Sequence, residues 1–265
     1  MLISNFWYIL AAVAPGFIIL FYIFRQDLFP EPKKIVFKTF IFGAAIVLAL
    51  DLILDDVDKY AEKFFSGESF HFFDNFIRAA FIEEFFKMIV LVFFCTRKDE
   101  FDEPMDGLVY GAAVSLGYAT YENIEYVLYY FKDPSFEIAL SRAYTAVPLH
   151  ALCGIMMGFL ITQSIFEKKH NYLNLILALL IPVGMHGLYN YSFASDKISY
   201  QIAYIILLVF SIRAFILFRN LKAKQKQAII FNKKYFYISI NNFIYSSSTV
   251  LLFYLFLNSL IIFFF

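Results

Sequence analysis

The sequence predicts an all-α, polytopic membrane protein, a transmembrane helical bundle of about eight spans. Of its 265 residues, 61% are hydrophobic and 21% are aromatic. Apolar runs of about 20 residues recur along the chain, which is the length that a helix needs to cross the hydrocarbon core of a bilayer. Every span should be helical, because lipid offers the backbone no hydrogen-bond partners.

We expect seven well-marked spans and a weaker eighth, at residues 6–24, 35–54, 70–94, 108–131, 136–166, 172–194, 200–218 and 250–265. The first has no lysine or arginine before it, so we expect an uncleaved anchor and not a signal peptide. The last is weak because residues 221–249 are polar and biased. Residues 221–265 are therefore predicted to be a basic linker with a C-terminal hydrophobic helix.

The charges of the connections predict the orientation. The first, third, fifth and seventh connections carry most of the lysine and arginine residues. Because basic loops remain in the cytoplasm, these connections should be cytoplasmic and the N-terminus should lie outside. Lys+Arg and Asp+Glu both number 22, so the net charge suggests no nucleic-acid partner.

The third predicted span, FHFFDNFIRAAFIEEFFKMIVLVFF, carries three charged residues in its middle. A charged side chain there costs about 2.5–3.5 kcal/mol on insertion scales. Lys87 lies four residues after Glu83 and three after Glu84, so it can reach either carboxylate along a helix. The three residues are therefore either a self-neutralising structural group or an acid–base site inside the membrane.

Three further spans carry polar residues at a similar depth. Glu83, Glu122, His150 and His186 each lie about 20 Å from the membrane face where their helix enters, at 1.5 Å per residue. Groups near the middle of antiparallel helices can meet in one layer, and scattered structural residues would have no reason to share a depth. We therefore expect these side chains to converge in one water-bearing chamber, although each histidine alone is more often a packing residue.

Other polar residues on these spans are candidates for supporting roles. Glu122 could simply pair with Arg142 or Lys87, but three carboxylates facing two cations exceed what neutralisation needs. Asn123 is adjacent to Glu122. Asn190 lies four residues after His186, on the same helix face, and could orient its ring.

Small residues predict where two of the helices touch. His150, Gly154 and Gly158 share one helix face, and Gly107 with Gly111 offers a similar surface on the fourth span. Such stripes allow close helix packing in membranes. We therefore expect His150 to point at protein and not at lipid.

This set of residues suits the hydrolysis of an amide by either of two mechanisms. Burial disfavours a charged glutamate, so a glutamate can take a proton from water near neutral pH, and a neutral histidine can donate a hydrogen bond to a developing oxyanion. That mechanism requires no cofactor. Alternatively, zinc or another divalent metal would bind to His150, His186 and Glu83, because two histidines and a glutamate form a known catalytic zinc set. The sequence leaves both open.

Common alternatives lack their motifs. The chain has no H-E-x-x-H zinc-protease helix and no G-x-S-x-G serine elbow. A transporter or channel that uses the same polar layer as a proton or cation relay stays open as a second hypothesis, because intramembrane acids are common in such proteins. A catalytically inactive membrane scaffold is a third.

Four motifs in order resemble the PrsW family of intramembrane proteases. Glu83-Glu84-Phe-Phe-Lys87 resembles E-E-x-x-K, and Asp106-Gly-x-x-Tyr-Gly followed by Gly-Tyr118-Ala-x-x-Glu122-Asn123 is similar to a second block, with Tyr118 where phenylalanine is usual. Arg142 with His150 and Gly158 resembles the third block, and His186-x-x-x-Asn190 the fourth. The match covers about 40% of the chain on four successive spans.

The resemblance implies an intramembrane endopeptidase of glutamic type in a bacterial plasma membrane. Residues 1–220 would form the membrane-embedded protease core, with the catalytic spans at about 70–194. The implied partners are a membrane-anchored protein substrate and the lipid bilayer, with an anti-sigma factor as the substrate of the type member.

The same resemblance implies roles for the polar residues. By the family's distant similarity to the CAAX prenyl-protease and bacteriocin-immunity group, Glu83 and Glu84 would activate water. His150 and His186 would stabilise the oxyanion or bind a metal, and the asparagines would orient their neighbours.

Overall fold

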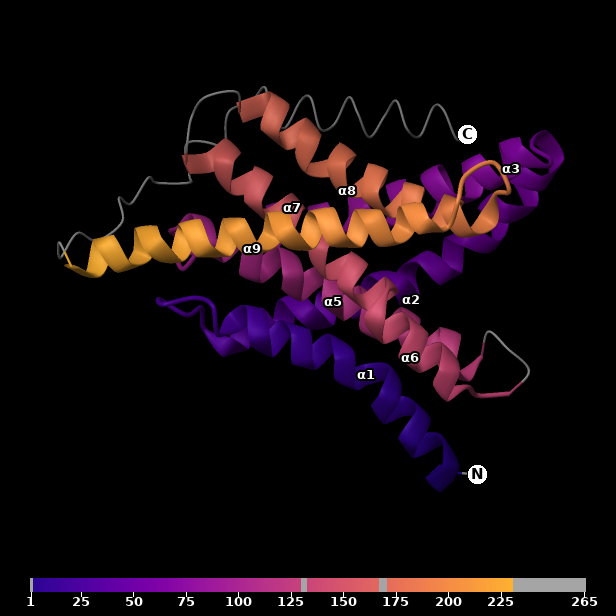
Figure 1. Cartoon of the computed structure of the whole chain (residues 1–265), viewed down its shortest axis with the longest axis horizontal. Coiled ribbons are helices and arrows are strands. Elements are labelled where there is room, and N and C mark those ends of the chain that lie inside the picture. Colours follow the sequence, from indigo (N-terminus) through magenta and orange to yellow (C-terminus); the bar gives the residue numbers. More distant parts are fainter. Residues whose placement is uncertain (1, 130–132, 167–170, 231–265) are drawn as a thin grey trace. The chain divides into compact units, whose positions relative to one another are not determined.

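The structure is a computed structural model of the whole chain, and it describes residues 2–129, 133–166 and 171–230. The described residues are mainly helical and contain no strand (Figure 1). Their elements, in chain order, are α1 (Leu2–Phe24), α2 (Lys33–Phe64), α3 (Glu68–Phe72), the π-helix η1 (Phe73–Phe81), α4 (Ile82–Val90), the π-helix η2 (Leu91–Cys95), α5 (Pro104–Leu128), α6 (Phe136–Tyr144), α7 (Ala146–Phe166), α8 (Asn171–Ala194) and α9 (Gln201–Ile230).

Five of the described helical stretches are long and apolar enough to cross a membrane, by length and composition: Phe6–Phe24, Lys33–Leu54, Phe136–Phe166, Tyr172–Ala194 and Gln201–Ile230. The predicted third and fourth spans are also helical but carry more polar residues. α9 continues past residue 220 as far as Ile230. The predicted eighth span, residues 250–265, lies outside the described residues. The chain is a multi-pass integral membrane protein built as an all-α bundle.

The low apolar content of α5 follows from its position in the bundle. It is buried continuously from Met105 to Thr120 and packs against α1, α2 and α7 (Figure 1). A helix that is enclosed by other helices needs no lipid-facing apolar surface, so it can carry glycine, serine and glutamate. By contrast, α9 exposes an apolar stripe of Ile205, Leu208 and Ile212, which has the spacing of one helix face and suits contact with lipid.

The predicted glycine contact joins α5 to α7. A Cβ atom built on Gly111 would lie 2.1 Å from the carbonyl oxygen of Gly154, and one on Gly158 would lie 1.8 Å from the carbonyl oxygen of Gly107. The two backbones therefore touch, as the small-residue spacing predicted. His150, one turn before Gly154 on α7, is buried as expected.

Two predicted spans are irregular. The third is a continuous succession of α3, η1, α4 and η2, in which two π-helical segments flank the turn that carries Glu83 and Glu84. π-Helical segments are rare and are frequent at functional sites. The fifth is interrupted at Thr145, which separates α6 from α7 and has non-helical dihedral angles (φ −124°, ψ −74°). Pro148 falls in the first turn of α7, where its missing N–H leaves no helical bond unmade.

Candidate active site

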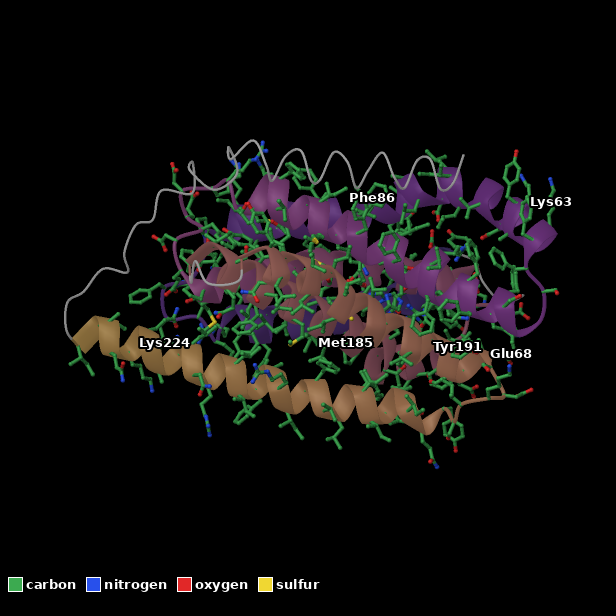
Figure 2. All side chains as sticks on the ribbon, turned by 90° about the horizontal axis from the view of Figure 1, so that it is seen from above. Lys63, Glu68, Phe86, Met185, Tyr191 and Lys224 are labelled. Carbon is green, nitrogen blue, oxygen red and sulfur yellow. The ribbon has the colours of Figure 1, made fainter. Side chains whose placement is uncertain are left out.

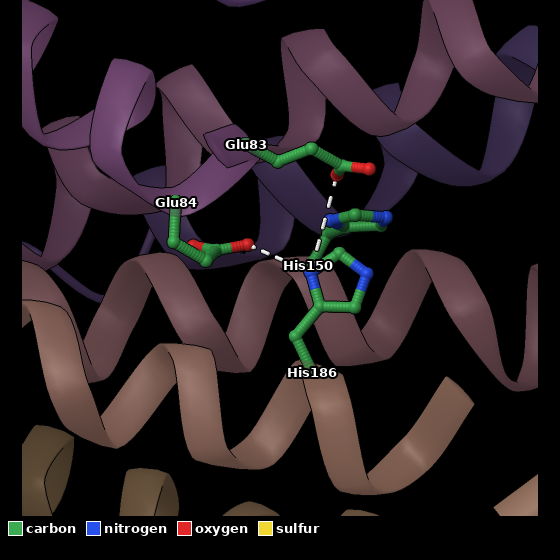
Figure 3. A group of neighbouring side chains, drawn as sticks. All are labelled: Glu83, Glu84, His150 and His186. Carbon is green, nitrogen blue, oxygen red and sulfur yellow. Dashed lines mark hydrogen bonds and ion pairs between the residues drawn. The ribbon is translucent and has the colours of Figure 1, made fainter. Parts of the chain in front are cut away.

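Three helices bring five of the predicted polar residues into one buried cluster. Glu83, Glu84 and Lys87 come from α4, His150 from α7 and His186 from α8. Figure 3 shows the two glutamates and the two histidines. One carboxylate oxygen from each of the two glutamates and one ring nitrogen from each of the two histidines lie within 4.8 Å of one another. The side chains point toward one another from facing helices, so they form the layer expected from their shared depth.

Lys87 lies within this cluster and is fully buried. Its Nζ atom donates to Glu84 Oε1 at 2.7 Å, to His150 Nδ1 at 3.1 Å and more weakly to Glu83 Oε2 at 3.5 Å. An ammonium group has three donors and no acceptor, so these contacts use all three protons. It follows that Nδ1 is the unprotonated nitrogen of His150.

The other nitrogen of His150 is tied to a second ion pair. His150 Nε2–H donates to Glu122 Oε2 at 3.1 Å, and Arg142 Nη2 donates to the same oxygen at 2.5 Å. Arg142 Nε also donates to Asn123 Oδ1 at 2.5 Å, and Asn123 Nδ2 donates to the carbonyl of Ala12 in α1 at 3.1 Å. Both ring nitrogens of His150 are therefore engaged, and its orientation is set by α4 and α5 together.

Only one nitrogen of His186 contacts the cluster. Its Nδ1 lies 3.1 Å from Glu84 Oε1 and 3.9 Å from Glu83 Oε2. A carboxylate accepts, so Nδ1 carries the proton and the opposite nitrogen, Nε2, is left for a ligand or substrate. The expected orienting partner, Asn190, forms no hydrogen bond to the ring among the described residues. Glu84 orients the ring instead, across the contact between α4 and α8.

The charges of the cluster and of the adjoining Glu122–Arg142 pair balance only with one additional proton. Glu83, Glu84 and Glu122 supply three carboxylates, whereas Lys87 and Arg142 supply two cations. An uncompensated charge is costly in a buried environment. Protonation of His186 at both nitrogens, next to Glu83 and Glu84, would make the cluster neutral.

The cluster is almost completely buried in this structure. Glu83 is 6% exposed, His150 and His186 are 2% exposed, and Glu84 is 0% exposed. The side chains that the sequence placed in a water-bearing chamber are thus enclosed by protein. A cavity of about 380 Å³ lies elsewhere, between α1, α7 and α9.

One residue of the site was not predicted as a participant. The ring of Tyr118, on α5, lies 4.1 Å from Lys87 Nζ and 5.7 Å from the ring of His150. Its hydroxyl group is directed at Glu83. The sequence offered one signal, since this position is aromatic in the family pattern that the chain resembles. No residue pattern in the sequence indicated the π-helical segments on either side of α4.

The residues present fit a metal ion by donor type and spacing. Two carboxylates and two imidazoles lie within 4.8 Å of one another, and Glu84 Oε2 is buried without a hydrogen-bond partner among the described residues. Lys87 already places a positive charge among the same groups. An ion here would share Glu84 with that ammonium. To bind the ion through Nδ1, His150 would have to lose its hydrogen bond with Lys87.

Comparisons with known proteins agree with the sequence motifs. Residues 31–216 match a family model described as PrsW family intramembrane metalloprotease. A protein of Oceanobacillus iheyensis named Protease PrsW is 37% identical over 182 residues, which cover 68% of this chain and 80% of that protein. The Protease PrsW of Bacillus subtilis (strain 168) is 34% identical over 202 residues, covering 75% and 88% of the two chains.

A more divergent relative, the Protease PrsW of Clostridioides difficile (strain 630), is 30% identical over 208 residues, covering 77% of this chain and 84% of that protein. No solved structure matches the chain. The region that matches the family model contains every residue of the buried cluster. The match to this family and to these proteases favours a peptidase over the transporter, channel and scaffold hypotheses. The chain belongs to the PrsW family of intramembrane proteases.

Proposed function

We propose that this peptidase hydrolyses a peptide bond of a membrane-anchored protein with a water molecule activated by Glu83. The observation that carries the proposal is the convergence of two carboxylates, a lysine and two histidines in one buried cluster. Family membership supports the reaction class, and the assignment of roles within the cluster rests on the geometry.

Glu83 is the carboxylate best placed to act as the general base. Glu84 is fixed by short contacts to Lys87 and His186, whereas the nearest cations of Glu83 lie 3.5 and 3.9 Å away. Glu83 is also the more exposed of the two. A carboxylate without a close cation can accept a proton from water as the water oxygen attacks the carbonyl carbon. When the C–N bond breaks, the same proton can pass from Glu83 to the departing amine.

His186 is the better placed of the two histidines to stabilise the oxyanion. Its Nδ1–H already donates to Glu84, so Nε2 can donate only when the ring is an imidazolium. A charged donor therefore replaces the neutral one expected from the sequence, because a neutral His186 would present a lone pair. Glu84 stabilises the charged ring, and a charged donor forms a stronger hydrogen bond to an oxyanion.

Glu122, Arg142 and Asn123 are positioning residues in this proposal. They hold His150, which in turn holds Lys87, and none of their hydrogen bonds reaches Glu83. Their loss should alter the orientation of the cluster more than the chemistry itself.

Zinc is the cofactor of the alternative mechanism. Glu83, Glu84, His150 and His186 would hold it, and a bound zinc ion lowers the pKa of a coordinated water to about 7. Elemental analysis of the purified protein, with chelator treatment before an activity assay, separates the two mechanisms. Full activity in protein without bound metal supports the glutamate mechanism, and activity that chelation removes and zinc restores supports the metal.

The substrate in this proposal is a single-span or otherwise membrane-anchored protein, and the family resemblance makes an anti-sigma factor the first to test. The experiment compares membrane-protein fragments in cells that express the wild type, Glu83→Gln or Glu137→Gln. Glu137 is an exposed residue of α6 and serves as the matched control. Fragments present with the wild type and the control but absent with Glu83→Gln support the proposal. The same fragments with all three proteins contradict it.

A further inference from the structure

A second group of buried acidic residues lies far from the candidate active site. Asp27 and Glu31 belong to the connection between α1 and α2, while Glu103 and Asp106 lie at the start of α5. Their exposed fractions are 6%, 5%, 3% and 0%. Asp106 precedes Glu122 by 16 residues on the same helix, a separation of roughly 24 Å.

Three of these carboxylates, those of Asp27, Glu103 and Asp106, lie close together, and each uses only part of its hydrogen-bonding capacity. Gln225, on α9, donates through Nε2 to Asp27 Oδ1 at 2.6 Å and to Glu103 Oε1. Asp106 Oδ2 accepts the backbone N–H groups of Asp102 and Glu103 at 2.8 and 2.7 Å. These contacts fix the carboxylates but supply no positive charge.

Two oxygens of the group receive no hydrogen bond from a donor among the described residues. These are Asp27 Oδ2 and Asp106 Oδ1, and both are buried. One oxygen each from Asp27, Glu103 and Asp106 lies within 4.8 Å of the others. Unsatisfied buried oxygens on converging carboxylates are costly unless a cation or a proton compensates them.

Nearby basic residues do not neutralise the group. No lysine or arginine in the described part of the chain forms an ion pair with Asp27, Glu103 or Asp106. The ammonium of Lys222 donates to the side chain of Gln26.

We propose that Asp27, Glu103 and Asp106 bind a hard divalent cation, Mg²⁺ or Ca²⁺. All of the available donors are carboxylate oxygens, which these ions prefer, and no histidine or cysteine belongs to the cluster to favour zinc. Asp27 Oδ2 and Asp106 Oδ1, which receive no hydrogen bond from the described residues, come from two different segments, and we expect them to bind the ion. This site is independent of the candidate active site.

The ion would act as a structural link. It would join the α1–α2 connection to the first turn of α5, and through Gln225 it would also fix the position of α9. The competing explanation is that protons neutralise the group without an ion. Glu31 would share such a proton with Asp106, because the two carboxyl groups face each other.

Thermal unfolding of the purified full-length protein in detergent tests the proposal. The protein is first treated with EDTA, and Mg²⁺ or Ca²⁺ is then added in separate series. Because an ion that binds only the folded state raises the melting temperature with concentration, we expect an increase of several degrees that saturates. Asp27→Asn and Asp106→Asn should each reduce or abolish the increase, since each removes a charged ligand but keeps an amide oxygen for the existing contacts.

Two control variants make the result specific. Glu100→Gln removes an exposed charge from the connection before α5 and should respond like the wild type. His186→Ala should also respond, whereas it would not if the ion bound at the candidate active site. The proposal is overturned if neither ion shifts the wild-type melting temperature, or if the shift is unchanged in both aspartate variants. If Asp106→Asn does not fold, Asp27→Asn alone decides the outcome.

Discussion

Lys87 is the cation on which the buried cluster depends, and Lys87→Met should be strongly destabilising. It removes the ammonium that compensates Glu84 within a fully buried group, and breaking such a pair costs about 3–5 kcal/mol. The free energy of unfolding in detergent measures this loss. Lys34→Met, at an exposed position near the start of α2, is the control. Equal stability of the two variants would contradict the prediction.

Tyr118 should stabilise the cluster mainly through the face of its ring. Tyr118→Phe retains that face, which contacts Lys87, and loses only the hydroxyl group directed at Glu83. Tyr118→Leu removes the ring and should lose a cation–π interaction of about 2 kcal/mol in this dry environment. Unfolding measurements on both variants check the ranking. A Tyr118→Phe variant as damaged as Tyr118→Leu would assign the effect to the hydroxyl group.

The contacts of Lys87 also show how far single residues can be predicted. Helix spacing placed it within reach of Glu83 and Glu84, and both contacts are present. Its contacts with His150 and Tyr118 depend on how α4, α5 and α7 pack, which no local pattern encodes. The protonation state of His150 follows from the contact with Lys87, so the sequence could not predict it either.

At the scale of elements, the close contact between α5 and α7 depends on glycine. Gly154→Ala should destabilise it by about 1–3 kcal/mol, the range that overpacking produces. A Cβ on Gly154 would lie 2.1 Å from the carbonyl oxygen of Gly111, so a backbone must move. Gly184→Ala is the matched control, since a Cβ there meets nothing within 4 Å. Equal melting temperatures of the two variants would show that α5 and α7 do not touch in this way.

The attachment of α3 to α8 should weaken in acid. Glu68 accepts hydrogen bonds from Tyr191 at 2.6 Å and from Ser195, and Figure 2 shows Glu68 beside Tyr191. These bonds lower the pKa of Glu68 below its ordinary value of 4.5. A lowered folded-state pKa means that the stabilisation is present above pH 4.5 and is lost as the pH falls through the folded value.

Comparison with Glu68→Gln isolates this effect. The wild type should melt at a higher temperature than Glu68→Gln above pH 4.5, and the difference should shrink as the pH is lowered. A difference that stays constant between pH 7 and pH 3 would contradict the assignment.

Helix contacts were easier to predict than helix irregularities. The spacing of Gly154 and Gly158 indicates a close contact because small residues recur on one face. The interruption at Thr145 is consistent with Pro148, which suits the first turn of a helix but not its interior. The π-helical segments around α4 depend on tertiary packing, and no single residue type marks them.

At the scale of the whole molecule, the depth of polar residues within their spans was the most informative signal. This depth predicted that side chains from different helices meet, because residues at the same depth in helices that cross one bilayer lie in one layer. It did not predict how completely the cluster is buried, since the packing of the helices decides that. No pattern in the sequence marks Asp27, Glu31 and Glu103 as a group, and only the fold shows that they are buried together.

The most direct test of the central claim is the rate of peptide-bond hydrolysis by the purified protein in proteoliposomes, with a membrane-anchored substrate identified from the fragment comparison. Because Glu83 is assigned as the general base, Glu83→Gln should be slower than the wild type by about 10²–10⁴-fold, whereas Glu137→Gln should match the wild type. Hydrolysis by Glu83→Gln at the wild-type rate would contradict the assignment.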